Sequence, residues 1–416
     1  MEKSIEKQLE LIRRNTVEII PEDELREKIE RSIATNTPLR VKIGLDPSRP
    51  DLHLGHVVVL QKLRDFQDLG HKAILIVGDF TGFIGDPSGR DSERPALDWE
   101  TVRKNAQTYF DQASKIIDYK SAEVRYNSEW LAPLTFRDVL ELARAFTVHR
   151  MLERDDFAKR YAEGSPITIM EFLYPLAQAY DSVAVRADVE LGGTDQRFNL
   201  MVGRIIQERF NQPPQSLVIM PLLEGTDGVR KMSKSFDNYI AIMEDPKDIY
   251  GKVMRIPDEL IGKWRQLLTL WTHDQREHLE KGIRDGSIHP MEAKKALAFD
   301  IVARFCSTKE AQAAQDHFTR VFSERELPPE HFIPEFVVPP QLVAESPEIR
   351  FIDIMVASGI AESKSEARKL IRSGSVYWKP SGKDERKITD ELETLSPPFS
   401  GILRAGKRRI IRLKEG

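Results

Sequence analysis

Two short motifs, far apart in the chain, constrain this sequence most. Residues 51–56 read Asp-Leu-His-Leu-Gly-His, and residues 231–235 read Lys-Met-Ser-Lys-Ser. The first motif follows an apolar run at 40–45 and a turn at 46–48, and it opens a helix predicted over 54–69. This order of strand, turn and helix predicts an α/β nucleotide-binding fold in which a helix N-terminus favours phosphate.

The first motif brings two imidazoles to that helix N-terminus. His53 and His56 can donate hydrogen bonds to phosphate oxygens as charge moves toward a leaving group, and Gly55 lets a nucleotide base lie against the backbone. The simpler interpretation is a pair of ordinary histidines at the start of a helix, and the motif alone leaves the two interpretations about even. The second motif favours the catalytic one.

The second motif follows an apolar run at 217–223 and a turn-rich stretch at 224–228, which predicts a mobile loop. Lys231 and Lys234 on this loop can stabilise a phosphate as it becomes pentacovalent, which raises the rate without tight ground-state binding. For an isolated Lys-x-x-Lys, a solvated basic loop is the better interpretation. The chain has no Gly-x-x-x-x-Gly-Lys-Ser/Thr and no Gly-x-Gly-x-x-Gly sequence, so no other nucleotide motif competes.

A third group of polar residues lies between the two motifs. Tyr174, Gln178 and Asp181 are spaced i, i+4 and i+7, so they share one face of a helix if that helix continues through Pro175. A core helix of mixed polarity is the alternative. The segment 78–90 has glycines that predict an open backbone beside a ligand.

These segments resemble the class I aminoacyl-tRNA synthetases and, within them, the tyrosyl-tRNA synthetases. The resemblance covers nearly the whole chain. It implies a Rossmann-like catalytic domain that activates tyrosine with ATP to tyrosyl-adenylate and pyrophosphate, and then transfers tyrosine to the 3'-terminal ribose of tRNA(Tyr). It also implies that Mg2+ arrives with ATP as the substrate complex, without a protein-bound metal, and that a homodimer forms near Leu134–Asp156.

The resemblance assigns roles to individual residues. It implies that Asp181 accepts a hydrogen bond from the substrate phenol. The residues expected to hold the rest of the tyrosine substrate are Asp86, Tyr174 and Gln178 at its ammonium group and Gln196 near its carboxylate. The residues expected to bind ATP are Asp46, Ser48, Gly55, Gly193, Asp195 and Lys234, with Asp195 on the ribose. Arg90 and Arg94 either approach the pyrophosphate or are surface charges. Asp195, in an expected Gly-Gly turn, could also be a helix cap.

The chain departs from one branch of this family. That branch has a tyrosine as a second partner for the substrate phenol, where this chain has Lys42. It also has a Trp-Gly pair where this chain has Arg197-Phe198. With the complete Lys-Met-Ser-Lys-Ser, these differences resemble the other bacterial branch and leave the second phenol contact open.

Composition limits the remaining possibilities. A chain of 416 residues is long enough for two or three domains. A single cysteine, Cys306, excludes an internal disulfide and a cysteine zinc site. No stretch is apolar enough to span a bilayer, and the charged start lacks the apolar core of a signal peptide, so we expect a cytoplasmic protein without a membrane partner.

Charge and proline content predict the domain organisation. From Arg350 to the end, 15 Lys and Arg face 9 Asp and Glu, a net of +6, although the whole chain has a net charge of -4. The predicted parts are a catalytic domain with an inserted dimerisation region over 1–238, an α-helical domain over 239–326, a proline-rich linker over 327–348 and a small α+β domain over 349–416.

The last part resembles the S4 RNA-binding module. Two helices are predicted over 351–359 and 363–374, and a small sheet follows them. The cations expected to contact a tRNA phosphate backbone are Lys364, Arg368, Arg372 and Arg408. A solvated face is the alternative for a basic tail without this helix pattern.

Three other functions remain open at this point. A tryptophanyl-tRNA synthetase shares both ATP motifs, although the basic tail and the set Tyr174, Gln178 and Asp181 argue against it. A nucleotidyltransferase would turn over without an amino acid. A non-catalytic RNA-binding protein would have lost motif residues, whereas His53 and Lys234 are present with their motif partners.

Overall fold

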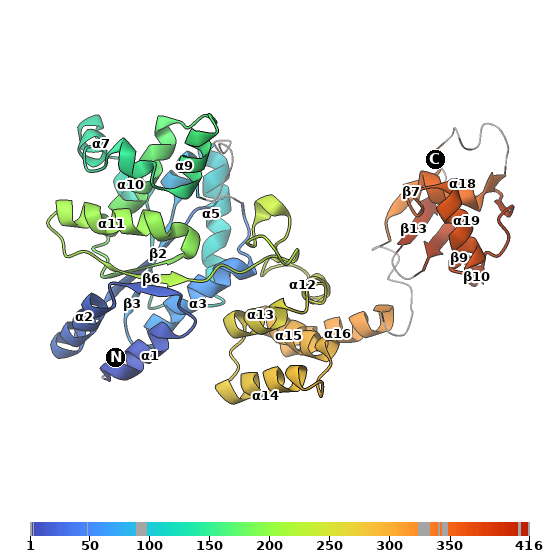
Figure 1. The fold of residues 1–416 in the computed structure, drawn as a ribbon, viewed down its shortest axis with the longest axis horizontal. Coiled ribbons are helices and arrows are strands. Elements are labelled where there is room, and N and C mark those ends of the chain that lie inside the picture. The colour runs from blue at the N-terminus through green and yellow to red at the C-terminus, as the bar shows by residue number, and fades with distance from the viewer. Residues whose placement is uncertain are drawn as a thin grey trace. The chain divides into compact units, whose positions relative to one another are not determined.

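The computed structural model describes residues 2, 4–47, 49–88, 98–322, 333–339, 342, 348–406 and 409–414. The chain folds as two compact units, residues 1–314 and residues 315–416. Figure 1 shows the ribbon of each unit with its own sheet.

A six-stranded sheet lies at the centre of the first unit, in the order β1-β6-β5-β2-β3-β4. Its strands are β1 (Glu18–Ile20), β2 (Arg40–Leu45), β3 (Lys72–Val77), β4 (Glu123–Tyr126), β5 (Val189–Gly193) and β6 (Ser216–Met220). All neighbours pair in parallel except β1, which is antiparallel to β6. The chain builds β3 and β4 on one side of β2 and later places β5 on the other side. This change of direction opens a crevice at the carboxyl ends of β2 and β5, where open α/β sheets bind ligands.

Helices pack on both sides of this sheet, with α10 and α11 on one side and α1, α2 and α3 on the other (Figure 1). The helices up to the end of this layer are α1 (Ile5–Arg13), α2 (Glu22–Thr35), α3 (Leu54–Asp68), α4 (Asp79–Ile84), α5 (Trp99–Ala113), α6 (Ser128–Leu131), α7 (Phe136–Ala143), α8 (Val148–Met151), α9 (Asp155–Ala162), α10 (Ile169–Ala184) and α11 (Arg197–Arg209). Short 3-10 turns, η1 (Thr194–Gln196) and η2 (Lys234–Phe236), lie beside the crevice. The predicted α/β class is confirmed.

The local predictions around the first motif agree with the structure. The predicted strand 40–45 is β2, and the predicted helix 54–69 is α3, which ends one residue earlier. Leu54, Val57 and Leu60 on α3 are fully buried. Helix α10 continues through Pro175, so Tyr174, Gln178 and Asp181 share one face of a helix.

Two expectations about glycine-rich segments were wrong. The segment after β3 forms helix α4 rather than an open backbone. Two hydrogen bonds hold the start of this helix: the Asp79 carboxylate accepts the Ser128 N–H, and the Phe80 N–H donates to Asn127 Oδ1. Gly78 is needed there for close approach, since a Cβ atom would lie 2.0 Å from Asp46 Oδ1. Gly192 and Gly193 end β5 instead of forming a turn.

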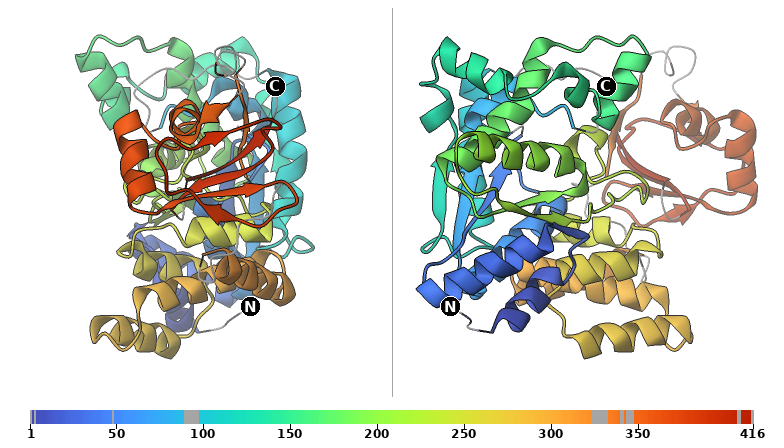
Figure 2. Two further views of the ribbon diagram at one scale, coloured as in Figure 1. Left: turned by 90° about the vertical axis from the view of Figure 1, so that its right-hand side faces the viewer. Right: turned by 60° about the vertical axis from the view of Figure 1, so that its left-hand side comes forward.

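A helical segment completes the first unit and continues past its end. It consists of α12 (Pro246–Val253), α13 (Leu260–Leu268), α14 (His273–Arg284), α15 (Pro290–Phe305) and α16 (Thr308–Phe322). These helices gather at the same end of the first unit as the N-terminus (Figures 1 and 2). Helix α13 packs on α3, and Asn15 Nδ2 donates to the Gln266 carbonyl at 3.0 Å. No helix in the described ranges is both long and apolar enough to cross a membrane.

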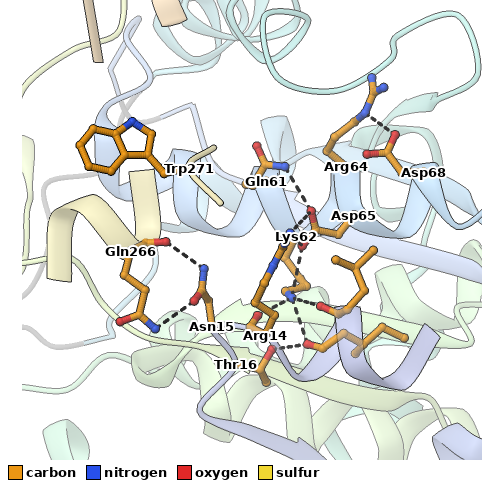
Figure 3. Close-up of polar contacts among 12 residues, drawn as sticks. Arg14, Asn15, Thr16, Gln61, Lys62, Arg64, Asp65, Asp68, Gln266 and Trp271 are labelled. Atoms are coloured by element: carbon orange, nitrogen blue, oxygen red, sulfur yellow. Dashed lines mark hydrogen bonds and ion pairs between the residues drawn. The ribbon is translucent and has the colours of Figure 1, made fainter. Parts of the chain in front are cut away.

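A buried lysine fixes α3 from behind. Lys62 is 1% exposed, and its ammonium donates to the carbonyls of Leu11, Ile12 and Arg14 at 2.9, 3.0 and 2.7 Å (Figure 3). It also pairs with Asp65 at 3.3 Å. A cation at the C-terminal end of α1 is favoured by the helix dipole. This contact ties α1 to the helix that carries the first motif.

The second unit contains a five-stranded sheet in the order β10-β9-β12-β13-β7 and a two-stranded sheet of β11 and β8. Its elements are β7 (Glu335–Val337), β8 (Ile349–Arg350), α18 (Phe351–Ala357), α19 (Lys364–Arg372), β9 (Val376–Pro380), β10 (Arg386–Lys387), β11 (Thr394–Leu395), β12 (Gly401–Ala405) and β13 (Arg409–Lys414). The core includes Trp378 and Phe351, with ring centroids 5.9 Å apart. Strand β7 lies inside the segment predicted as a linker, and its parallel pairing with β13 makes it part of this sheet.

Candidate active site

The two motif histidines lie at the start of α3 with their protonation fixed by the backbone. His53 is the N-cap of α3, and its ring Nδ1 accepts the backbone N–H of Gly55 at 3.1 Å. The backbone N–H of His53 donates to His56 Nδ1 at 3.1 Å. Both Nδ1 atoms are therefore acceptors, which places the proton of each neutral ring on Nε2. Burial is the main cause that lowers the pKa values of His53 and His56, and the pKa of His56 is lowered to about 3. Each ring is a neutral hydrogen-bond donor at physiological pH.

The glycine between them is required by this arrangement. A Cβ atom on Gly55 would lie 2.9 Å from His53 Cε1 and 3.7 Å from the Met232 side chain. The first contact would displace the imidazole from its cap position. Gly55 therefore keeps the ring in place, in addition to leaving the cavity wall open.

The second motif crosses over the same cavity. Met232 is buried, and its N–H donates to the Leu223 carbonyl at 2.7 Å, while Ser233 N–H donates to Asn238 Oδ1 at 2.8 Å. Lys234 is 8% exposed at the start of η2, and its Nζ donates to the Tyr109 hydroxyl at 3.3 Å. These bonds anchor the backbone of the loop and aim its lysines at the cavity.

Lys231 has a different partner. Its Nζ pairs with Asp195 Oδ2 at 2.6 Å, and the two side chains are 28% and 21% exposed. Asp195 makes no helix-capping bond, because it lies inside η1 and Gln196 is the N-cap of α11. The cap interpretation of Asp195 is therefore wrong. The carboxylate is available to exchange its lysine for a ligand.

The polar face of α10 forms the opposite end of the cavity. The Tyr174 hydroxyl donates to Asp46 Oδ2 at 2.8 Å, and the Asn199 side chain donates to Gln178 Oε1 at 3.0 Å. Asp181 accepts the Trp130 Nε1–H at 2.8 Å and an N–H of Asn127 at 3.3 Å. Every polar residue on this face is thus already oriented by a neighbour.

Asp181 is the electrostatic centre of this end. It is 2% exposed, and burial raises its pKa to about 7, although the Lys42 charge and the Trp130 and Asn127 hydrogen bonds oppose the rise. A carboxylate with this pKa changes its charge near neutral pH. Burial and the nearby carboxylates of Asp46 and Asp86 raise the pKa of Tyr174, so its phenol stays protonated.

Between these two ends lie the remaining predicted residues. Gln196 Nε2 donates to Asp86 Oδ2 at 2.8 Å, and Asn199 donates to Gln196 Oε1 at 3.1 Å. On the other wall, Thr81 Oγ1 donates to Asp46 Oδ1 at 2.6 Å. The cavity therefore has two carboxylates and an amide at its middle.

Most of these side chains line one cavity of about 300 Å³, and Tyr109, Asn127, Trp130, Asn199 and Asn238 support it from outside the lining. The predicted site residues among its walls are Asp46, His53, Gly55, His56, Asp86, Tyr174, Gln178, Asp181, Gly193, Asp195, Gln196, Lys231 and Lys234. Ser48, Arg90 and Arg94 lie outside the described residues. The structure thus brings together every predicted residue of this unit that it describes.

Comparison with known proteins assigns the family. A family described as class I tRNA synthetases (W and Y) matches residues 34–323. A tyrosine–tRNA ligase of Thermotoga maritima is 51% identical over 411 residues, which cover 99% of this chain and 98% of the relative. The chain belongs to the tyrosyl-tRNA synthetases. Another tyrosine–tRNA ligase, of Carboxydothermus hydrogenoformans, is 48% identical over 98% of each chain.

A solved structure supports the same family. The tyrosyl-tRNA synthetase of Archaeoglobus fulgidus, in complex with L-tyrosine, has a TM-score of 0.61 and 25% identity. The match covers 75% of this chain and 100% of that one. The resemblance inferred from the motifs is thus confirmed at the level of family and fold.

The described cations expected to bind tRNA in this synthetase are all paired with acids. Lys364 lies 2.8 Å from Asp353, and Arg368 lies 3.8 Å from Glu391. Arg372 bonds the same Glu391. Arg408 lies outside the described residues. The basic face of α19 is real, but an RNA phosphate would have to replace carboxylate partners there.

Several residues that shape the site escaped the sequence analysis. The missed side chains are Thr81, Asn127, Trp130, Arg154 and Asn199. Asn127 and Trp130 directly follow β4, at the same sheet edge as Asp46, so the strand order could have indicated them. Arg154, 6% exposed and paired with Asp156 at 2.7 Å, had no such signal.

Proposed function

We propose that the protein activates L-tyrosine with ATP and then transfers it to the 3'-terminal ribose of tRNA(Tyr). The observation that carries this proposal is one cavity with a buried carboxylate, Asp181, at one end and the neutral imidazoles and lysines of both motifs at the other. Full-length similarity to tyrosine–tRNA ligases supports it.

In the first step, a carboxylate oxygen of tyrosine attacks the α-phosphorus of ATP, and the bond to the bridging oxygen of pyrophosphate breaks. No side chain acts as the nucleophile, so positioning and charge stabilisation supply the rate. His53 and His56 donate Nε2–H bonds to phosphate oxygens, and Lys231 and Lys234 neutralise the charge that develops on pyrophosphate. Mg2+ enters with ATP as part of the substrate.

The ribose and base of ATP have their own proposed contacts. Asp195 accepts hydrogen bonds from the ribose hydroxyls after Lys231 has moved to the phosphates. Gly193 allows the close approach, because a Cβ atom there would lie 2.7 Å from Asp195 Oδ1. Asp46, Ser48, Gly55 and Lys234 complete the proposed ATP site.

Tyrosine is selected at the α10 end. Asp181 accepts the phenol O–H, while Tyr174, Gln178 and Asp86 hold the ammonium group and Gln196 lies near the carboxylate. Phenylalanine would leave a buried carboxylate without this partner, which is costly.

The second step needs a bound tRNA. We propose that Lys364, Arg368, Arg372 and Arg408 contact its phosphate backbone. Contacts to phosphates are screened by salt, so tRNA binding should be weaker at high salt. Lys364, Arg368 and Arg372 are paired with Asp353 or Glu391, so tRNA binding should also rearrange these ion pairs. We propose a helical domain over 239–326 and a C-terminal domain of residues 349–416 together with β7 as the parts that present the tRNA to the cavity.

A homodimer is proposed from the exposed apolar residues of the region Leu134–Asp156. Phe136, Leu140 and Val148 are 78, 53 and 62% exposed there. Nearby Ile169 is 79% exposed. Large apolar side chains gathered on a surface mark interaction sites.

Exchange of pyrophosphate into ATP, measured with each of the twenty amino acids, tests the proposed activity. Exchange with tyrosine alone, together with tyrosine-dependent charging of tRNA(Tyr), is the expected result. Exchange with tryptophan would move the activity to the related synthetase. Turnover without any amino acid would indicate a nucleotidyltransferase and contradict the proposal.

A further inference from the structure

A buried ion pair lies beneath the tyrosine end of the cavity and has no role in the steps above. Lys42 on β2 and Glu190 on β5 are register partners in neighbouring parallel strands. Lys42 Nζ lies 2.9 Å from Glu190 Oε1, and the two side chains are 0% and 2% exposed. Removing two charges from water is expensive, and an apolar pair in the same strands would avoid that cost. The pair therefore calls for a functional explanation.

The pair touches the stretch of α10 that carries the specificity residues. Lys42 Nζ donates to the Gln178 carbonyl at 3.4 Å, and the Ser182 hydroxyl donates to Glu190 Oε2 at 3.3 Å. Asp181 lies between these two contact points in the sequence. Its carboxylate faces the cavity, whereas Lys42 is outside the described lining of that cavity. The ammonium thus contacts the backbone of α10 three residues before Asp181 and is not part of the described cavity wall.

Charged and polar groups face Asp181 from each neighbouring element. Lys42 on β2 favours the ionised carboxylate, as do the donors Trp130 on α6 and Asn127 just before it. Glu190 on β5 disfavours it, but less than Lys42 favours it. Burial also disfavours the charge, and it is the largest influence on the Asp181 pKa. Lys42 is therefore the one positive charge among these groups that offsets the burial of Asp181.

Direct contact between Lys42 and the substrate phenol fits the geometry less well. Lys42 has no exposed surface, and its ammonium is already directed at Glu190 and at the Gln178 carbonyl. A phenol in the cavity meets Asp181 first, because Asp181 and not Lys42 forms the wall. The ammonium acts on the substrate through the carboxylate.

We propose that the Lys42–Glu190 pair sets the charge state of Asp181, so that Lys42 is a positioning residue for the choice of tyrosine over phenylalanine. The inference rests on the proposed function, since it concerns how that site recognises a phenol. Lys42 favours the acceptor-only form that a phenol O–H needs, and Glu190 moderates this effect while holding the ammonium in place.

The test compares Lys42→Met and Glu190→Gln in the full-length protein. For each variant, kcat/KM for tyrosine and for phenylalanine is measured by pyrophosphate exchange between pH 6 and pH 9. The tyrosine value should fall as the pH drops through the Asp181 pKa of about 7. In Lys42→Met this fall should occur about one pH unit higher, which lowers the tyrosine value about fivefold at pH 7. In Glu190→Gln it should occur at lower pH.

The two variants should shift the midpoint of the pH dependence in opposite directions, which separates an effect of charge from an effect of structure. A merely structural pair would weaken both variants at every pH and leave the midpoint of the fall unchanged, which would overturn the inference. Lys42→Arg should restore the wild-type midpoint. If Lys42→Met does not fold, the double variant with Glu190→Gln removes both charges and should still raise the midpoint, because Lys42 has the larger effect.

A matched control comes from a second buried lysine. Lys28 is 6% exposed and donates to the carbonyls of Asp188 and Pro214 and to the Ser216 hydroxyl, away from the cavity. Lys28→Met should destabilise the protein without moving the midpoint. Equal shifts in Lys28→Met and Lys42→Met would contradict the inference. Wild-type protein that shows no exchange with tyrosine would instead contradict the proposed function, and the inference with it.

Discussion

The two ends of the cavity differ in how they hold their polar groups before a substrate arrives. At the tyrosine end, Asp181 is 2% exposed and bonded to Trp130 and Asn127, which are themselves fixed in the core. At the phosphate end, Lys231 is 28% exposed and its partner, Asp195, is the residue proposed to bind ribose. In the proposed function, one end keeps its partners when tyrosine binds, and the other exchanges a partner for ATP.

This difference matches what each end has to do. Selection of tyrosine depends on a buried acceptor that is costly to leave unpaired, which requires a rigid and dry environment. Stabilisation of a leaving pyrophosphate should appear only as charge develops, and a lysine with a replaceable partner can supply it at that moment. The predictions below test this contrast.

The largest effect is expected at the phosphate end. Lys234→Ala should lower kcat for adenylate formation by about 100- to 1,000-fold, because a cation aimed at developing charge is lost, with little change in the tyrosine KM. Pyrophosphate exchange measured at varied tyrosine concentration gives both constants. Lys281→Ala, on the exposed side of α14, is the control with normal kinetics. A tyrosine KM that rises as much as kcat falls would remove the contrast.

The next effect concerns the exchangeable pair. Asp195→Asn should raise the KM for ATP about tenfold, since an amide accepts ribose hydroxyls less well than a carboxylate, and it should leave the KM for tyrosine unchanged. Steady-state exchange with each substrate varied in turn gives both constants. An unchanged ATP KM would contradict the ribose contact.

A comparable or smaller effect is expected at the tyrosine end. Trp130→Phe removes the N–H donor at 2.8 Å from Asp181, so kcat/KM for tyrosine should fall by up to about tenfold while the ATP KM stays constant. Trp271→Phe, in the helical segment outside this cavity, is the control. If the ATP KM changed as well, the two ends would not be separate.

The smallest effect is expected on the pH dependence, whose midpoint should not move when a motif histidine is replaced. Burial lowers the pKa of His56 to about 3 and lowers that of His53 well below its usual range, so both motif histidines are neutral near pH 7. Burial raises the pKa of Asp181 to about 7. Since tyrosine binding needs ionised Asp181, kcat/KM should fall as the pH drops through 7. His56→Asn should lower the rate but keep that midpoint. A midpoint lost in this variant would assign the titration to the phosphate end.

The sequence indicated most of the catalytic end because its signals are local. A helix N-terminus, a strand before it and a lysine pair on a loop depend on residues a few positions apart. The strand Arg40–Leu45 and the helix from Leu54 were therefore predicted almost to the residue. The same holds for the face of α10, since one helical turn fixes the spacing of Tyr174 and Gln178.

The partners of these residues depended on the tertiary structure. Trp130 reaches Asp181 across 51 residues of chain, and Lys42 reaches Glu190 only because β5 returns to lie beside β2. In the sequence Lys42 marked only a departure from a related branch. Strand order makes it one half of a buried ion pair with Glu190.

By itself, the sequence determined the fold class, the two motifs and most of the polar residues that line the cavity, because short-range periodicity and turn chemistry place the motifs on their elements. The tertiary structure decided which groups orient those residues, and it placed β7 in the C-terminal sheet although its sequence predicts a linker. It also raised the pKa of Asp181 to about 7, because the burial that raises it and the Lys42 charge that opposes the rise exist only when distant strands pack together.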